Sequence, residues 1–211
     1  MKKLASEVGY AWHILWRPFD GFWDLKHEKK GSKLSATVIL VALVLAFIIQ
    51  QQFTGVLYGN TEVSKLQSNI IFTIFGVLFP FFLWCISNWC LTTLMDGEGT
   101  FGDIYMATAY ACVPLIIILM PLSILSNWMA LDMFSYYVFF TSAAIAWTGF
   151  LMVVSTLVVH QYGIFKTLIT CGLIIVGIVI IIFLVLLFYN LCSQLFGFVL
   201  SIVNEITFRF F

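Results

Sequence analysis

The chain has 211 residues, of which 62% are hydrophobic and only 9% are charged. Water-soluble domains carry roughly 25% charged residues, so a soluble globular protein is excluded and the solvent must be partly lipid. The formal net charge of zero hides an asymmetry, because seven of the ten Lys and Arg lie at or before Lys33. This basic cluster directly precedes the first apolar run, so it predicts a topogenic signal rather than a nucleic-acid-binding face.

The first segment, residues 1–33, shows a helical period. Its apolar side chains recur at positions that share one helix face, namely Leu4, Val8, Trp12, Leu15, Phe19 and Phe22. The charged residues Glu7, Arg17, Asp20 and Asp24 fall on other faces. Pro18 is expected to end one helix and begin a second, because proline is tolerated in a first turn but not inside a helix.

Tryptophans beside several cations favour an interfacial position for this segment, on the cytoplasmic face of the membrane. A docking surface for a partner protein is the second interpretation, and the two are compatible. The side chains expected to bind such a partner are Trp12, Trp16, Arg17, Phe19, Phe22 and Trp23.

Five charge-free stretches follow, each about as long as the roughly 20 helical residues that cross a hydrocarbon core. They are residues 34–52, 70–95, 104–125, 134–159 and 168–188. Their continuous apolarity, without a period of two, favours helices over a barrel. The sequence therefore predicts an all-α, polytopic membrane helix bundle. Five transmembrane helices occupy residues 34–190, and amphipathic helices stand at the N- and C-termini.

The last segment, residues 191–211, is expected to form the C-terminal amphipathic helix on the outer face. It carries a polar stripe at helical spacing, made of Ser193, Gln194, Gly197, Ser201, Asn204 and Glu205. Glu205 and Arg209 form a favourable i,i+4 pair. A sixth, incomplete span is the alternative, which the two charges near its end disfavour.

The distribution of Lys and Arg predicts the orientation, because cytoplasmic loops are enriched in both. With five spans, the ends of the chain lie on opposite sides of the membrane. A cytoplasmic N-terminus places the seven N-terminal cations and Lys166 on one side, and Lys65 and Arg209 on the other. We therefore expect a multi-pass protein of the cell (cytoplasmic) membrane with its N-terminus cytoplasmic and its C-terminus outside.

No catalytic, cofactor-binding or metal-binding residues are expected, and the chain is predicted not to be an enzyme. None of the five spans contains Asp, Glu, Lys, Arg or His, the side chains that mark proton relays and ion pathways. Serines and threonines in the spans have no base nearby to activate them. The five cysteines form no C-x-x-C pair and show no metal-ligand spacing.

The loop after the second span carries three acidic residues, Asp96, Glu98 and Asp103. Three carboxylates suit a hard divalent cation. The neighbouring glycines, however, are typical of a tight turn, and Thr100 or Asp103 is typical of a helix cap. Capping is the favoured interpretation, and the role of the three carboxylates stays open.

Three prolines, Pro80, Pro114 and Pro121, interrupt predicted transmembrane helices. Each frees a backbone carbonyl, and broken helices line substrate sites in many transporters. A small transporter or channel that uses the second and third spans is therefore an alternative function. It requires a polar, water-accessible cavity between them. Without polar groups around the prolines, structural kinks are favoured.

The stretch from Gly97 to Ile104 (GEGTFGDI) is followed by Tyr110, Ala111 and Pro114. It resembles the central part of Yip1-domain membrane proteins, in which a glycine-rich turn leads into a helix carrying Tyr-Ala-x-x-Pro. Residues 17–32 (RPFDGFWDLKHEKKGS) resemble the bacterial, Gram-positive branch of that family. The likeness covers most of residues 1–188 and identifies Gly99, Tyr110 and Pro114 as the turn and helix-kink residues.

The resemblance implies a protein without catalytic residues. Eukaryotic Yip1 proteins organise trafficking membranes and bind small GTPases, and bacterial relatives are often encoded beside carbohydrate ABC importers. The implied role is an accessory or scaffold subunit that binds the lipid bilayer and other membrane proteins, such as the permease subunits of a carbohydrate ABC importer. A membrane-shaping protein that acts through its terminal amphipathic segments is a further alternative to a transporter or channel.

Overall fold

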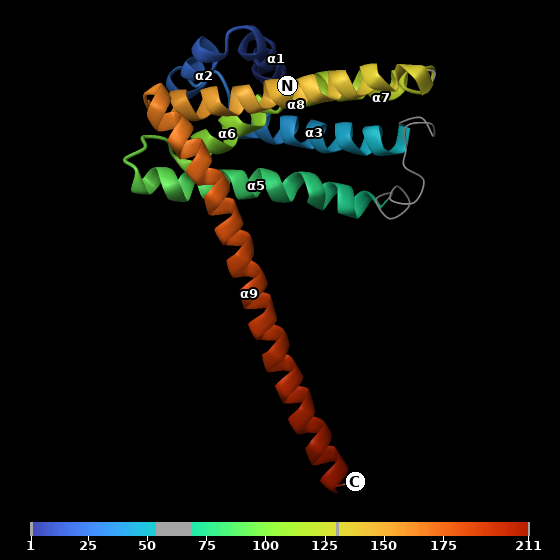
Figure 1. Cartoon of the computed structure of the whole chain (residues 1–211). Helices are drawn as coiled ribbons and strands as arrows, with labels where there is room; N and C mark the ends of the chain where they lie inside the picture. Colours follow the sequence, from blue (N-terminus) through green and yellow to red (C-terminus); the bar gives the residue numbers. More distant parts are fainter. Residues whose placement is uncertain (1, 54–68, 130, 211) are drawn as a thin grey trace.

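The computed structural model describes residues 2–53, 69–129 and 131–210, and these ranges form helices and no strands (Figure 1). Within them, five helical stretches are long and apolar enough to cross a membrane. They are Lys33–Gln52, Ile70–Leu94, Phe101–Leu125, Phe134–His160 and Ile164–Ile202. Each coincides with one predicted span, so the prediction of an all-α bundle with five transmembrane helices is confirmed.

The bundle is built from α3 (Lys33–Phe53), α5 (Ile70–Leu94), α7 (Val113–Leu125) and α8 (Phe134–His160), which run along a common direction in Figure 1. The short helix η1 (Leu131–Met133) precedes α8. The N-terminal helices α1 (Lys2–Trp16) and α2 (Pro18–His27) pack against α3 and α8. They lie near the end of the bundle where α3 and α6 (Phe101–Ala111) begin and α8 ends.

Local signals in the sequence set several helix ends. The side chain of Asn69 caps α5 by accepting a hydrogen bond from the N–H of Ile71 at 3.0 Å. Pro18 stands in the first turn of α2, directly after α1 has ended, so the predicted change of helix at Pro18 is confirmed. After α8, Gln161 adopts a left-handed φ of 53°, which is a common way to end a helix.

The third span consists of two helices, α6 and α7, rather than one kinked helix. Pro114 in the first turn of α7 has no N–H to bond the carbonyl of Tyr110. The N–H of Cys112, between the two helices, instead bonds the carbonyls of Thr108 and Ala109, each at 3.2 Å. The helix is therefore broken at Cys112, whereas α5 and α7 continue through Pro80 and Pro121.

The last helix, α9 (Ile164–Phe210), has 47 residues and continues through Leu191 without a break. The fifth span and the predicted C-terminal amphipathic helix are thus parts of one helix, because no proline separates them. Its apolar part, Ile164–Ile202, has 39 residues, or about 58 Å at 1.5 Å per residue. The hydrocarbon core is only about 30 Å thick. Figure 1 shows α9 leaving the bundle at a steep angle. The location of residues 191–211 on the outer face stays a prediction.

The core lies where α1, α2, α3, α5, α6 and α8 meet, with Val113 of α7, and its largest fully buried side chains include Tyr110, Phe22 and Ile14. α9 joins this assembly through α5. The hydroxyl of Ser87 donates to the carbonyl of Ile174 at 2.8 Å, and a Cβ on Gly177 would lie 2.5 Å from the Ser87 hydroxyl. A glycine at position 177 therefore allows the two helices to approach closely.

Candidate functional site

The inner face of α1 is made of Glu7, Ala11 and Ile14, which are buried. Trp12, on the predicted apolar face, is 59% exposed, and Glu7, on another face, is only 8% exposed. The sequence did not predict which face of α1 packs on the bundle. Glu7 can be buried there because its carboxylate accepts a hydrogen bond from the Ser32 hydroxyl at 2.5 Å.

A buried polar cluster fastens α1 to the bundle through Tyr110. The Tyr110 hydroxyl donates to the backbone carbonyl of Glu7 at 2.9 Å and lies 3.0 Å from Ser35 Oγ. Ser35 Oγ in turn donates to the carbonyl of Ser32 at 2.7 Å, in the first turn of α3. Tyr110 was expected at a helix kink. It stands two residues before the break at Cys112, and its hydroxyl joins α6 to both α1 and the start of α3.

The second helix, α2, is fixed by both packing and charge. Phe22 and Leu25 are buried, so Phe22 belongs to the core and not to the exposed surface that was expected to bind a partner. A Cβ on Gly21 would lie 2.7 Å from Ile14 Cγ1, which shows how closely α1 and α2 approach each other. Lys26 Nζ donates to the carbonyl of Val159 at 2.9 Å, at the end of α8.

Four aromatic side chains project from the outer sides of α1 and α2. Trp12, Trp16, Phe19 and Trp23 are 59%, 75%, 53% and 48% exposed. Each helix contributes one i,i+4 pair, so the members of a pair lie on the same helix face. Arg17, between the two helices, is also exposed. These five residues are called the aromatic platform below, and they are the predicted partner-binding residues except Phe22.

An ionic and hydrogen-bonded network ties α1 to α2 beside the platform. Tyr10 donates to Asp24 Oδ2 at 2.8 Å, and Lys30 approaches the same oxygen at 2.7 Å. The hydrogen bonds from Lys30 and Tyr10 lower the pKa of Asp24. The same bond to Asp24, with one to Glu28, raises the pKa of Lys30. Burial, reinforced by the bond to Asp24, raises the pKa of Tyr10.

The glycine turn, residues 97–99, makes room for two aromatic side chains, that of His160 at the end of α8 and that of Tyr162 just after it. A Cβ on Gly97 would lie 2.7 Å from both His160 Nδ1 and the Tyr162 hydroxyl. A Cβ on Gly99 would lie 2.7 Å from His160 Cε1 and 2.6 Å from Val159 Cγ1. The buried His160 accepts a hydrogen bond from the N–H of Gly99 through Nδ1 at 3.3 Å. Glycine is therefore required here by close contact, and neither of these glycines has a positive φ.

The three acidic residues Asp96, Glu98 and Asp103 do not share one binding partner. Thr100 and Asp103 form a reciprocal capping box at the start of α6, so the interpretation as a helix cap is confirmed. Glu98 Oε2 lies 3.3 Å from Lys26 Nζ, and Asp96 adopts a left-handed φ of 56°. Among the described residues there is no group of three or more His, Cys, Asp or Glu that would suit a metal ion.

Side chains at the start of α9 and just before it cap the C-terminal end of α5. Tyr162 and Lys166 both donate to the carbonyl of Met95, at 3.0 and 2.8 Å. Lys166 also lies 4.1 Å above the Tyr162 ring, a favourable cation–π distance. Burial, together with the charge of Asp96, raises the pKa of Tyr162. A cation at this carbonyl suits the negative end of the α5 helix dipole.

The structure thus brings together two regions that are far apart in the sequence. Lys26 of α2 contacts both Glu98 of the glycine turn and the end of α8. Sequence reasoning missed Lys26 as a contact residue because it stands in a run of similar cations. It also missed His160, whose partner is a backbone N–H. The paired glycines at 97 and 99 were interpreted as a tight turn, and their close contact with the side chains at the end of α8 was not predicted.

A family model described as the Yip1 domain matches residues 12–200. The matched range includes α2, the glycine turn, Tyr110, Pro114 and most of α9. No curated protein and no solved structure matches the chain. Because the family model covers most of its length, this integral membrane protein belongs to the Yip1-domain family.

Proposed function

We propose that the chain is a non-enzymatic membrane scaffold that binds another integral membrane protein through the aromatic platform. The observation that carries this proposal is the exposure of four large aromatic side chains on two helices whose inner faces are buried. Tryptophan, tyrosine and arginine dominate the binding energy of protein interfaces. The platform supplies three Trp and one Arg from two consecutive helices.

The rigidity of the platform supports this role. Hydrogen bonds from Tyr110 to the Glu7 carbonyl and from Ser32 to the Glu7 carboxylate hold α1 on the bundle. Burial of Phe22 and a hydrogen bond from Lys26 to α8 hold α2. A surface that is ordered before binding loses less conformational entropy when a partner arrives. The aromatic side chains therefore start from a fixed support, which favours specific docking.

The proposed partner is a permease subunit of a carbohydrate ABC importer in the cell membrane. This choice is supported by the likeness of residues 17–32 to the bacterial branch of the family. A membrane-embedded partner suits the location of the platform, because α1 and α2 pack directly on the spans α3 and α8.

The orientation that we propose has the N-terminus in the cytoplasm and the C-terminus outside. Lys26, Lys30, Lys33 and Lys166 all stand near the end of the bundle where α3, α6 and α9 begin. Such a cluster of cations is typical of the cytoplasmic side. The aromatic platform then faces the cytoplasmic interface, where the cytoplasmic loops of a permease are within reach.

The transporter or channel alternative requires a polar cavity beside the prolines. The cavity beside Pro80 is lined mainly by apolar side chains, and no ionisable side chain except Cys112 is among its lining residues. It therefore lacks the polar character that the alternative needs. Membrane anchoring and membrane shaping would use the same aromatic side chains as partner binding. An experiment is therefore needed to distinguish these roles.

Affinity purification in mild detergent at native expression tests the proposal. The wild-type chain is compared with a Trp16→Ala, Trp23→Ala double variant and with Trp128→Ala, a control that removes a Trp that is 81% exposed outside the platform. We expect permease and ATPase subunits with the wild type and the control. Loss of a hot-spot side chain weakens binding by about 2 kcal/mol or more. The affinity of the double variant for its partner, and with it the amount of co-purified permease, should therefore fall at least roughly 30-fold.

Two results would overturn the proposal. One is recovery of the wild-type chain alone, which leaves membrane anchoring or shaping as the role of the aromatic side chains. The other is equal recovery of the partner with the double variant and the control, which places the interface elsewhere on the bundle.

A further inference from the structure

An elongated cavity of about 830 Å³ lies between α3 and α5, with its inner wall on α7, α8 and α9. This volume is within the range of about 300–1,000 Å³ that is typical of small-molecule sites. Along α5 the cavity follows Phe72, Gly76, Pro80 and Trp84, which are spaced by four residues and so share one face of the helix. Phe72, Gly76 and Pro80 are exposed, so this side opens outward from the bundle.

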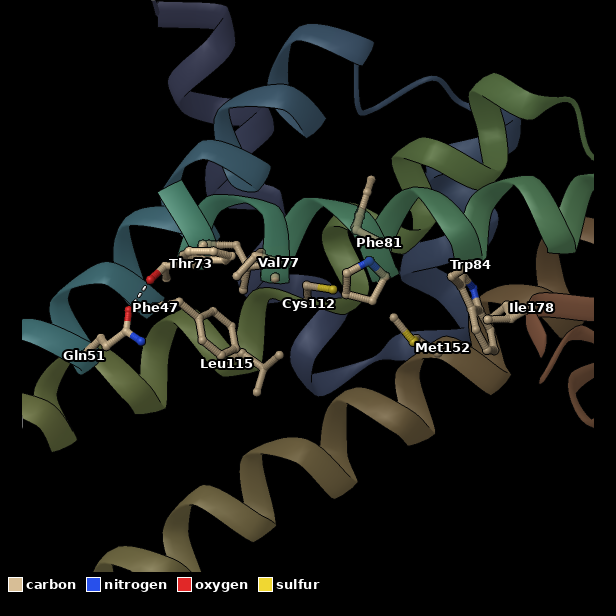
Figure 2. Close-up of a pocket in the computed structure, with 14 residues that line it drawn as sticks. Phe47, Gln51, Thr73, Val77, Phe81, Trp84, Cys112, Leu115, Met152 and Ile178 are labelled. Carbon is tan, nitrogen blue, oxygen red and sulfur yellow. Dashed lines mark hydrogen bonds between the residues drawn. The ribbon is translucent and has the colours of Figure 1, made fainter. Parts of the chain in front are cut away.

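Two features of the backbone create the hollow. Gly76 has no side chain, and a Cβ added there would meet nothing within 4 Å. The break between α6 and α7 lies opposite, and Cys112 and Leu115 on either side of Pro114 form part of the inner wall. Figure 2 shows these two residues, together with Met152, between the two ends of the cavity.

The two ends of the cavity differ in polarity. At one end Thr73 donates a hydrogen bond to the side chain of Gln51, and Figure 2 shows this pair at the left of the view, beside Phe47. Gln51 stands in the last turn of α3 and Thr73 in the first turn of α5, so this end lies at the membrane interface farther from α1 and α2. The other end is closed by Trp84 and Ile178, and the indole Nε1 of Trp84 is buried there without a hydrogen-bond partner among the described residues.

The length of the cavity matches one leaflet of a bilayer. Phe72 and Trp84 are twelve helical positions apart, which corresponds to about 18 Å. Half of the hydrocarbon core is about 15 Å. The cavity thus begins at an interface and ends near the middle of the bilayer, with its polar pair at the level of lipid headgroups and ester groups.

We propose that this cavity is a binding site for one acyl chain of a phospholipid from the leaflet farther from the N-terminal helices. The chain lies along Gly76 and Pro80 and ends at Trp84 and Ile178. The polar part of the lipid remains beside Thr73 and Gln51. The match of length, the largely apolar wall and the hydrogen-bonded Thr73–Gln51 pair at one end distinguish this site from the outer part of α9, where Phe183, Phe188 and Phe196 are simply exposed.

The test uses the full chain in vesicles of phosphatidylglycerol that contain a small fraction of the same lipid with a diazirine in the middle of one acyl chain. After irradiation, labelled peptides are mapped by mass spectrometry. We expect labelling of the peptides that carry residues 72–84 to exceed labelling of the α9 peptides that carry residues 183–196, which do not line the cavity, at least fivefold. Equal labelling of the two regions would overturn the proposal.

A filled cavity provides the second arm of the test. Gly76→Phe places a ring in the cavity, and Gly149→Phe is its control, because a Cβ at either glycine meets nothing within 4 Å and Gly149 does not line the cavity. We expect Gly76→Phe to reduce labelling at residues 72–84 at least fivefold, and Gly149→Phe to leave it unchanged. Undiminished labelling in Gly76→Phe would overturn the proposal. If Gly76→Phe does not fold, the comparison of labelled peptides in the wild-type chain alone tests the proposal.

A diazirine amino acid in place of Phe72, which lines the cavity, distinguishes the lipid from a second copy of the chain. Cross-linked dimers joined through residues 72–84, with little lipid attached there, would show that another protein helix occupies the cavity and would overturn the assignment to an acyl chain.

Discussion

Glu7 and His160 are buried side chains with ionisable groups, and both stand where the N-terminal helices meet the bundle. Each is held by a neutral donor: Glu7 by the Ser32 hydroxyl and His160 by the N–H of Gly99. Buried polar atoms require such partners. These contacts explain the small residues at positions 32 and 99, because a larger side chain would displace the groups that make them.

Gly99→Ala is predicted to destabilise the chain. The new Cβ would lie 2.6 Å from Val159 Cγ1 and 2.7 Å from His160 Cε1, closer than van der Waals contact permits. Overpacking of this kind costs about 1–3 kcal/mol, so the melting temperature in detergent should fall. Gly163→Ala is the control, because a Cβ there meets nothing within 4 Å. Equal melting temperatures of the two variants would contradict the role assigned to the glycine turn.

Asp24 gives the N-terminal helices a defined dependence on pH. Its folded-state pKa is lowered by Lys30 and Tyr10, below an unfolded value of about 3.9. Its stabilisation is therefore present above about pH 4 and is lost as the pH falls through the lowered pKa. The pKa of Lys30 is raised, so its contribution is present below about pH 10.4 and is lost as the pH rises further.

The measurement is the difference in melting temperature between the wild type and Asp24→Asn across a pH series. We expect a constant difference between about pH 5 and pH 9, and a smaller one below about pH 4. A difference that grows on acidification would show that Asp24 does not stabilise the folded state in its ionised form.

The positions of the transmembrane helices were predictable from the sequence, because the lipid environment constrains them directly. A hydrocarbon core requires every backbone polar group to be bonded within a helix, so long charge-free runs locate the spans. Pro18, Asn69 and Thr100 mark helix starts through local chemistry. The inner face of α1 was not predictable, because it depends on Ser32 and Tyr110, which are distant in the sequence.

Tyr110→Phe is predicted to loosen α1 without disturbing the spans. It removes the hydroxyl that bonds the carbonyl of Glu7 and contacts Ser35, a loss of about 1 kcal/mol. Hydrogen–deuterium exchange should become faster in residues 2–16 and stay unchanged in α8. Tyr105→Phe serves as the control, because its hydroxyl contacts the exposed side chain of Thr37 and no group of α1. Equal exchange of α1 in both variants would contradict the proposed attachment.

At the scale of the whole molecule, the described residues offer two distinct surfaces. The aromatic platform lies near the end of the bundle where the cations gather, and the apolar cavity runs along α5 from the other end, where Gln51 and Thr73 lie, to Trp84. α9 adds a third feature, because its apolar length of about 58 Å exceeds the membrane core and it leaves the bundle steeply. The number of spans followed from composition. The contact between the N-terminal helices and the glycine turn did not, because it joins residues more than 70 positions apart.

The central claim is that the aromatic platform touches a protein partner and not only lipid. A photo-cross-linking amino acid placed at Trp16 in native membranes tests it directly, with the same replacement at Trp128 as the control. Both side chains are largely exposed, at 75% and 81%. We expect a discrete adduct with a permease subunit from position 16 and none from position 128. Adducts with lipid alone at position 16, or the same protein adduct from both positions, would contradict it.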